Sequence, residues 1–155
     1  MVQFPVIDSG LEALSLTDDA KPQPGVPKAA LPIPLHARMG LKVLARGPRS
    51  VTTMELSDEV RGAFDGTIHG GILATLADVT CALSTWGTYD VDVEVPVTTD
   101  MHVRYYRQPL SGPLTANAEL VHNGRRILTS ECSIVDGQNR ELARVTATFM
   151  LISRT

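Results

Sequence analysis

The stretch HGGILATLADVTCALSTW, His69–Trp86, decides the fold of this chain. After its two glycines it contains no proline and is rich in Ala and Leu, which predicts a helix over Gly71–Trp86. Its larger apolar residues recur at helical spacing and are predicted to form one buried stripe: Ile72, Leu76, Val79, Leu83 and Trp86. Because the helix is apolar or small nearly all round, we expect protein to surround it.

Asp78 is the one charged residue of this helix, and it lies off the apolar stripe. An ionised carboxylate in such surroundings is costly unless it is hydrogen-bonded or faces a cleft. Its neighbours on that side are small and leave room for a ligand: Ala74, Cys81, Ala82 and Thr85. From periodicity alone, Asp78 is equally a satisfied structural acid or a reactive group.

The composition is that of one globular domain, with 155 residues, 43% of them hydrophobic and 20% charged. The net charge of −3 and the dispersed basic residues argue against binding to nucleic acid. We expect a cytoplasmic protein without membrane attachment, since no segment reaches the roughly 20 apolar residues of a bilayer span and the N-terminus does not resemble a signal peptide. Cys81 and Cys132 match neither a disulfide framework nor a metal site and are predicted to be buried thiols.

The N-terminal part of the chain differs from the rest, because six of the ten prolines lie in residues 1–34. This density of proline forbids continuous regular structure. We therefore expect a proline-rich arm over residues 1–37 and a single domain over residues 38–155.

The second half of the chain has the two-residue period of β-strands. Over Val97–Tyr106 the odd-numbered residues are expected on one sheet face and the even-numbered ones, including Thr98, on the other. Tight turns at Asn123-Gly124 and Asp136-Gly137 indicate hairpins, so we predict an antiparallel meander. The predicted elements besides the long helix are a short helix over Leu35–Met39 and strands over Leu41–Leu44, Val51–Leu56 and residues 97–106, 114–122, 126–135 and 141–152. The long helix would cover the apolar face of the sheet, which is an α+β fold.

The two glycines at the start of the helix offer chemistry. Unpaired N–H groups and the positive end of the helix dipole lie there, and the absence of side chains lets an anion approach Gly70 and Gly71. With the carboxylate of Asp78 they would supply donors for an oxyanion and a base or nucleophile, as acyl transfer requires. The two features are roughly 12 Å apart by helical rise, so one carbonyl reaches both only if a second copy of the chain contributes one of them.

The string GTIHGG, Gly66–Gly71, together with Leu76-Ala77-Asp78, resembles the hotdog-fold acyl-CoA thioesterases of the phenylacetate-pathway (PaaI-like) and 4-hydroxybenzoyl-CoA thioesterase type. The likeness covers roughly residues 38–152. It continues in MHVRYYRQP (101–109), GPLTA (112–116), HNGRR (122–126) and LARVTATF (142–149). The resemblance implies a long central helix wrapped by a curved antiparallel sheet of about five to six strands. It also implies a homodimer with sites at the interface, commonly paired again into a homotetramer.

The resemblance implies roles for individual residues. Asp78 falls on the family's catalytic carboxylate, which attacks the thioester or activates water. The amide of Gly70, with that of Gly71, would polarise the thioester carbonyl, and His69 would shape the loop. No metal and no cofactor are implied, because the thiolate leaves readily and coenzyme A is part of the substrate. One position departs from the family pattern: six residues before the histidine, where such enzymes carry Asn or Gln, this chain has Ala63.

We therefore expect an acyl-CoA thioesterase that releases a small or medium, possibly aromatic, acid and free coenzyme A. The predicted substrate-binding residues are Asp65, Thr67, Ala82, Thr85, Arg107, Arg125 and Arg126, the arginines being candidates for the coenzyme A phosphates. The isolated histidines His36, His102 and His122 are expected to be structural. The alternative is a non-catalytic hotdog module that binds acyl-CoA as a sensor or carrier, which the missing amide at Ala63 leaves open. A hotdog dehydratase is less favoured, because its usual pairing of a histidine and an acid is not found.

Overall fold

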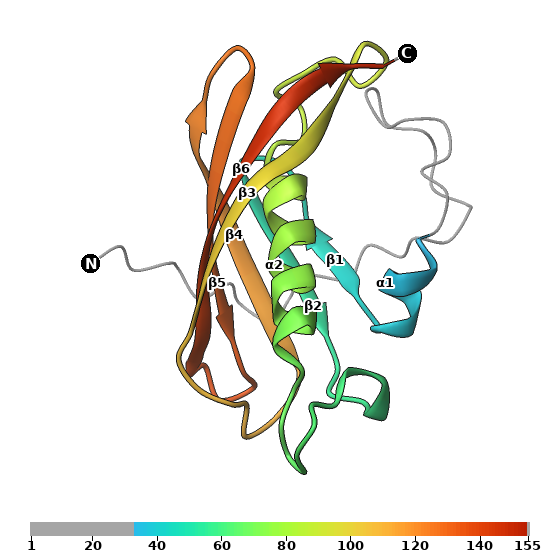
Figure 1. The fold of residues 1–155 in the computed structure, drawn as a ribbon, viewed down its shortest axis with the longest axis vertical. Helices are drawn as coiled ribbons and strands as arrows, with labels where there is room; N and C mark the ends of the chain where they lie inside the picture. The colour runs from blue at the N-terminus through green and yellow to red at the C-terminus, as the bar shows by residue number, and fades with distance from the viewer. Residues whose placement is uncertain (1–32, 155) are drawn as a thin grey trace.

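One antiparallel sheet of six strands curves around the long helix α2, which forms the second layer (Figure 1). The structure is a computed structural model that describes residues 33–154, so most of the predicted arm lies outside the described residues and its boundary stays a prediction. The elements are α1 (Pro34–Arg38), β1 (Lys42–Ala45), β2 (Arg49–Met54), a 3-10 turn (Asp58–Val60), α2 (Gly70–Ser84), β3 (Glu94–Tyr105), β4 (Leu114–Asn123), β5 (Ile127–Val135) and β6 (Glu141–Ser153). The predicted α+β class and the predicted helix against a curved sheet are confirmed.

The order of the strands differs from the predicted meander. The sheet runs β1-β2-β4-β5-β6-β3, so β4, β5 and β6 are consecutive hairpins but β3 pairs with β6 instead of β4. The meander prediction is wrong at this point because β4 already has β2 on one edge and β5 on the other, which leaves no edge for β3. As a result β3, the second-longest strand, lies at one edge of the sheet with one side unpaired by the described residues (Figure 1).

The face of α2 that packs on the sheet is not the predicted stripe. Only Leu76 of that stripe is fully buried, whereas Ile72, Val79, Leu83 and Trp86 are partly exposed. The buried face follows helical spacing through smaller residues: Leu73, Leu76, Ala77, Thr80, Cys81 and Ser84. The prediction was wrong because a hydropathy pattern counts Thr and Ser as polar. Here the hydroxyl groups of Thr80 and Ser84 find hydrogen-bond partners on the sheet, which allows both residues to lie in the core.

Hydroxyl pairs join α2 to the sheet in the core. Thr80 Oγ1 lies 2.6 Å from Thr52 Oγ1 of β2, and Ser84 Oγ lies 2.6 Å from Ser130 Oγ of β5. Ser50 Oγ also donates to the carbonyl of Thr80 at 2.6 Å. Each of these polar groups is buried and satisfied, so the pairs set the position of α2 along the sheet at little desolvation cost. This position determines where Gly70 and Asp78 lie.

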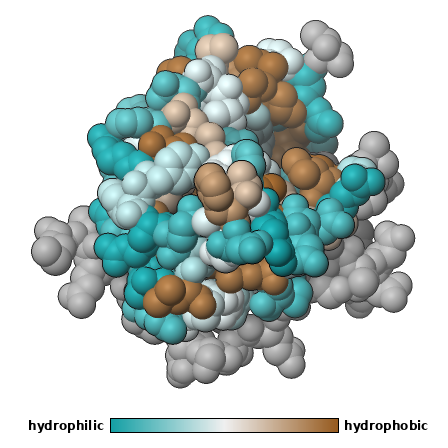
Figure 2. Space-filling model, turned by 60° about the horizontal axis from the view of Figure 1, so that its bottom comes forward, coloured by the Kyte–Doolittle hydropathy of each residue, from teal (hydrophilic) through white to brown (hydrophobic). Residues whose placement is uncertain are grey.

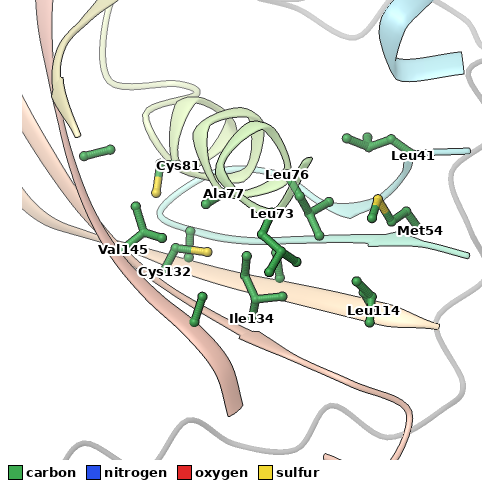
Figure 3. Packing of buried hydrophobic residues seen from close by; sticks show 14 of the residues in the cluster. Leu41, Met54, Leu73, Leu76, Ala77, Cys81, Leu114, Cys132, Ile134 and Val145 are labelled. Atoms are coloured by element: carbon green, nitrogen blue, oxygen red, sulfur yellow. The ribbon is translucent and has the colours of Figure 1, made fainter. Parts of the chain in front are cut away.

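The two cysteines lie in the core between α2 and the sheet, as predicted. Figure 3 shows Cys81 of α2 and Cys132 of β5 among the apolar side chains that join the two layers. A hydrogen bond with Cys81 and burial raise the pKa of the Cys132 thiol well above its usual value. Cys132 is therefore an inert packing group, and Cys81 is fully buried beside it. Among residues 33–154, no helix has the length and apolar character needed to cross a membrane, and no cluster of potential metal ligands is present.

Candidate active site

The start of α2 is organised by the side chain of His69. His69 is the N-cap residue, and its Nδ1 accepts a hydrogen bond from the Gly71 N–H at 3.0 Å. A Cβ atom on residue 71 would lie 3.0 Å from that nitrogen, closer than side chains normally approach, so Gly71 leaves room for the cap. Because Nδ1 accepts, the proton of the neutral imidazole sits on Nε2. His69 thus shapes the turn through the helix cap, and the Gly71 amide is already used.

The backbone N–H of Gly70 differs from that of Gly71 in its hydrogen bonding, although the sequence motif does not distinguish the two glycines. No hydrogen bond within residues 33–154 uses the Gly70 N–H. The Tyr105 hydroxyl donates to the Gly70 carbonyl at 3.0 Å, and the Tyr105 ring lies 3.5 Å from the place that a Cβ of residue 70 would occupy. The free N–H group lies at the positive end of a 15-residue helix, where negative charge is favoured.

Asp78 is held from the neighbouring strand by a residue that sequence reasoning missed. Thr98 of β3 donates its hydroxyl hydrogen to Asp78 Oδ1 at 2.8 Å. No hydrogen bond within the described residues involves Oδ2 of the same carboxylate. Asp78 is half-buried, so one oxygen is fixed by the fold and the other is open to a ligand or to water.

A β-bulge explains why Thr98 reaches Asp78. Thr98 pairs with Phe149 of β6 and Asp100 pairs with Thr148, so Thr99 is an extra residue that shifts the register. Directly paired residues point to the same side of a sheet, and Phe149 points into the core. Thr98 therefore faces α2, together with Met101 beyond the bulge. The predicted strict alternation, which put Thr98 on the opposite face from Met101, is wrong because the bulge reverses the pattern at this point.

A histidine expected to be structural lies close enough to Asp78 to feel its charge. Burial lowers the pKa of His36, on α1, and the negative charge of Asp78 partly opposes that shift. The structure thus brings α1 and the centre of α2 into the same electrostatic environment. The spacing of 42 residues between the two carries no sequence signal for this proximity.

The predicted loop residues Asp65 and Thr67 lie in a self-contained turn. Asp65 is fully exposed and forms a 3.7 Å ion pair with Arg61, while the Thr67 hydroxyl donates to the Phe64 carbonyl. Both line an open depression that residues 56–68 form without Asp78. Ala63, at the position of the family's amide, is exposed in the same turn. Seen from this end of the molecule, the surface is mostly hydrophilic with separate hydrophobic patches (Figure 2).

The predicted substrate-binding residues do not gather in one place within one chain. Arg107 is exposed two residues beyond Tyr105, so it lies near Gly70. Arg125 and Arg126 line a pocket with Glu94, at the other end of β3, about 36 Å away by the rise of 11 strand residues. Thr85, the C-cap residue of α2, is buried and donates its hydroxyl hydrogen to the carbonyl of Ala82, which is itself half-buried.

Comparison with known proteins adds to this geometry. A family model described as the thioesterase superfamily matches residues 65–143, just over half of the chain. A protein of Deinococcus radiodurans named as an esterase is 29% identical over 124 residues, which cover 79% of this chain and 77% of the relative.

Solved structures are similar over most of the described residues. A mutant of the phenylacetic acid degradation protein PaaI from Thermus thermophilus has a TM-score of 0.65 and 30% identity, covering 76% of this chain and 98% of that one. A thioesterase from Haemophilus influenzae has a TM-score of 0.71 and 23% identity, covering 77% of this chain and 82% of that one, a likeness that shows the fold.

Proposed function

This chain belongs to the thioesterase superfamily, and from that premise we propose that it hydrolyses acyl-CoA thioesters to free acids and coenzyme A. The acyl group is small or medium in size, with aromatic groups among the candidates. One observation carries the proposal: Thr98 holds the Asp78 carboxylate by one oxygen on a face of small side chains. A carboxylate that is fixed through one oxygen and leaves the other open to a ligand suits a general base or a nucleophile.

The chemistry follows from the two groups that the structure leaves free. The Gly70 N–H would donate a hydrogen bond to the thioester oxygen and so stabilise the negative charge that develops on it. Oδ2 of Asp78 would attack the carbonyl carbon or take a proton from an attacking water molecule, and the thiolate of coenzyme A would leave. If the carboxylate attacks, the product is a mixed anhydride on Asp78, which water hydrolyses to release the acid and restore the carboxylate.

The site needs two chains, because Gly70 and Asp78 are about 12 Å apart along one helix. We propose that two copies pair through the free edge of β3, which is 12 residues long and would otherwise expose a row of unpaired backbone groups. An antiparallel pair centred near Met101 and His102 would place Thr98 of one copy opposite Tyr105 of the other. Thr98 is hydrogen-bonded to Asp78, and Tyr105 is hydrogen-bonded to Gly70. This pairing would therefore bring the Asp78 carboxylate of one chain close to the Gly70 amide of its partner.

The same pairing would bring the predicted phosphate-binding arginines of the two chains close together. In an antiparallel pair the Glu94 end of one β3 meets the Tyr105 end of the other. Arg125 and Arg126 of one chain would then flank the same site as Arg107 of its partner, which supplies cations for the coenzyme A phosphates. A further pairing of dimers into tetramers stays a prediction from the resemblance.

The test is thiol release from a panel of purified acyl-CoAs, from acetyl-CoA to hexanoyl-, benzoyl- and phenylacetyl-CoA. We expect turnover of at least one of them at about 1–100 s⁻¹. Saturable binding of an acyl-CoA without turnover of any would contradict hydrolysis and support the binding module, which the alanine at position 63 leaves open. A protein that neither binds nor cleaves them would exclude both.

Replacing Thr98 with valine should lower kcat about tenfold, since a hydrogen bond to a charged group contributes about 1.5 kcal/mol or more. Valine keeps the shape of the side chain but no longer fixes Asp78, so we expect KM to change little. Steady-state kinetics on the best substrate measures both constants. Thr99→Val is the matched control, because the Thr99 hydroxyl donates to the Thr148 carbonyl instead of Asp78. Equal kcat values in the two variants would remove the role given to Thr98.

A further inference from the structure

The turn that carries Gly70 is gripped by residues at and beyond the end of β3. Gln108 Oε1 accepts a hydrogen bond from the Ile68 N–H at 2.9 Å, two residues before Gly70. The Tyr105 hydroxyl donates to the Gly70 carbonyl at 3.0 Å. These two bonds lie on either side of His69, so they restrain the turn from both ends.

Three of the four consecutive N–H groups in this turn are occupied. The Ile68 N–H donates to Gln108, the His69 N–H donates to the Val60 carbonyl at 3.1 Å, and the Gly71 N–H donates to His69 Nδ1. Within the described residues the Gly70 N–H alone is left over. Each occupied N–H fixes the plane of its peptide group, so the bonds on both sides determine the direction of the Gly70 N–H.

The backbone of Gln108 is itself anchored to an ion pair whose carboxylate is buried. Its backbone carbonyl accepts from Arg140 Nη2 at 3.3 Å, and Arg140 forms a 2.6 Å ion pair with Asp136 in the turn between β5 and β6. Asp136 also accepts from the Leu110 N–H at 3.2 Å.

Asp136 is ionised at any physiological pH. Burial alone would raise its pKa, but the amides of Arg140 and Leu110, the Arg140 side chain and the amide of Gln138 lower it to about 2. The backbone of residues 108–110 is therefore tied to the turn between β5 and β6, and from this fixed backbone the Gln108 side chain reaches the Ile68 N–H.

We infer that Gln108 is a positioning residue, whose side-chain carbonyl aims the Gly70 N–H at the oxyanion through its bond to Ile68. This inference rests on the proposed thioesterase function. Gln108 does not touch the reacting atoms, and the acceptor oxygen is the part of its side chain that matters. Without this acceptor oxygen, the turn can move and the Gly70 N–H can shift. A misplacement of a reacting or stabilising group by about 1 Å lowers the rate on the order of 100-fold.

The test compares Gln108→Leu, which removes the acceptor at similar size, with Gln108→Glu, which retains an acceptor oxygen. Gln108→Leu should lower kcat about 10-fold to 100-fold with little change in KM, because the Gly70 N–H that Gln108 positions would stabilise the transition state. Gln108→Glu should stay within about threefold of the wild-type kcat. Circular dichroism and thermal melting confirm that each variant is folded.

Each outcome decides the inference. Unchanged kcat in a folded Gln108→Leu variant overturns it, as do equal losses in Gln108→Leu and Gln108→Glu, since the second keeps the acceptor. If Gln108→Leu does not fold, Gln108→Asn takes its place, because its shorter side chain withdraws the acceptor from Ile68. A wild-type protein without turnover contradicts the proposed function, whereas an active wild type with insensitive Gln108 variants contradicts this inference alone.

Discussion

Asp78→Asn is expected to lower kcat for thioester hydrolysis by about 10²–10⁴-fold, the range that a lost base or nucleophile produces. Asparagine has the same shape and can still accept the Thr98 hydroxyl hydrogen through Oδ1, so the fold and the local packing should persist. It can neither attack a carbonyl nor take a proton at neutral pH. Substrate affinity should survive, which a direct binding measurement such as calorimetry with the best substrate can show.

The matched control for Asp78→Asn is Asp92→Asn, which removes one negative charge from an exposed position in the turn before β3. Its kcat should stay within about twofold of wild type, since isolated surface charges contribute little. Unchanged turnover in Asp78→Asn would show that the carboxylate is structural, the role that periodicity alone left equally open. Equal losses in the two variants would attribute the effect to net charge.

The helices and strands of this fold could be predicted from sequence, because their apolar residues recur at regular spacing along the chain. The helix over residues 71–86 and the six strands follow from helical and two-residue periods, and each lies within a few residues of its predicted bounds. The order of neighbouring strands was also predicted correctly where a tight turn joins them. The predicted neighbour of β3 was wrong, because residues 106–113 connect strands that are not adjacent in the sheet, and no local sequence signal indicates which edge a strand will join.

The details of the site depend on single-residue events that periodicity does not contain. One extra residue at Thr99 turns Thr98 towards Asp78, and an alternating pattern reads the same with or without it. The pair of glycines was visible as a potential anion site, but the cap that His69 makes with Gly71 is what separates an occupied amide from a free one. The motif thus indicated a candidate site, and the hydrogen bonds show which of its atoms have no partner within the described residues.

Gly70→Pro is expected to lower kcat by about 10²–10³-fold, the cost of removing one oxyanion donor. Proline deletes the N–H of residue 70 and no other donor, and the fold can accept it. Residue 70 is the first of the helix, where proline is favoured, and His69 has φ −68° and ψ 128°, which suits a residue before proline. No hydrogen bond within residues 33–154 is lost, and the Cβ would meet the Tyr105 ring at an ordinary 3.5 Å.

Gly70→Ala is the control for that variant, because it adds the same Cβ but keeps the N–H. Its kcat should remain within about threefold of wild type, with a small loss for the new contact. Steady-state kinetics and thermal melting of both variants separate the donor from the added bulk. If alanine is as damaging as proline, crowding against Tyr105 explains the loss and the Gly70 amide is not the donor.

Mixing Gly70→Pro with Asp78→Asn tests whether each site is built by two chains. A dimer with one chain of each kind contains one site with both defects and one site with an intact Gly70 and an intact Asp78. Random exchange makes half of the dimers mixed, so two nearly inactive proteins should together recover about a quarter of the wild-type activity. Recovery should require subunit exchange, for example co-expression or mild denaturation and refolding. If a site used Gly70 and Asp78 of the same chain, both kinds of site in the mixed dimer would be defective and no activity would return.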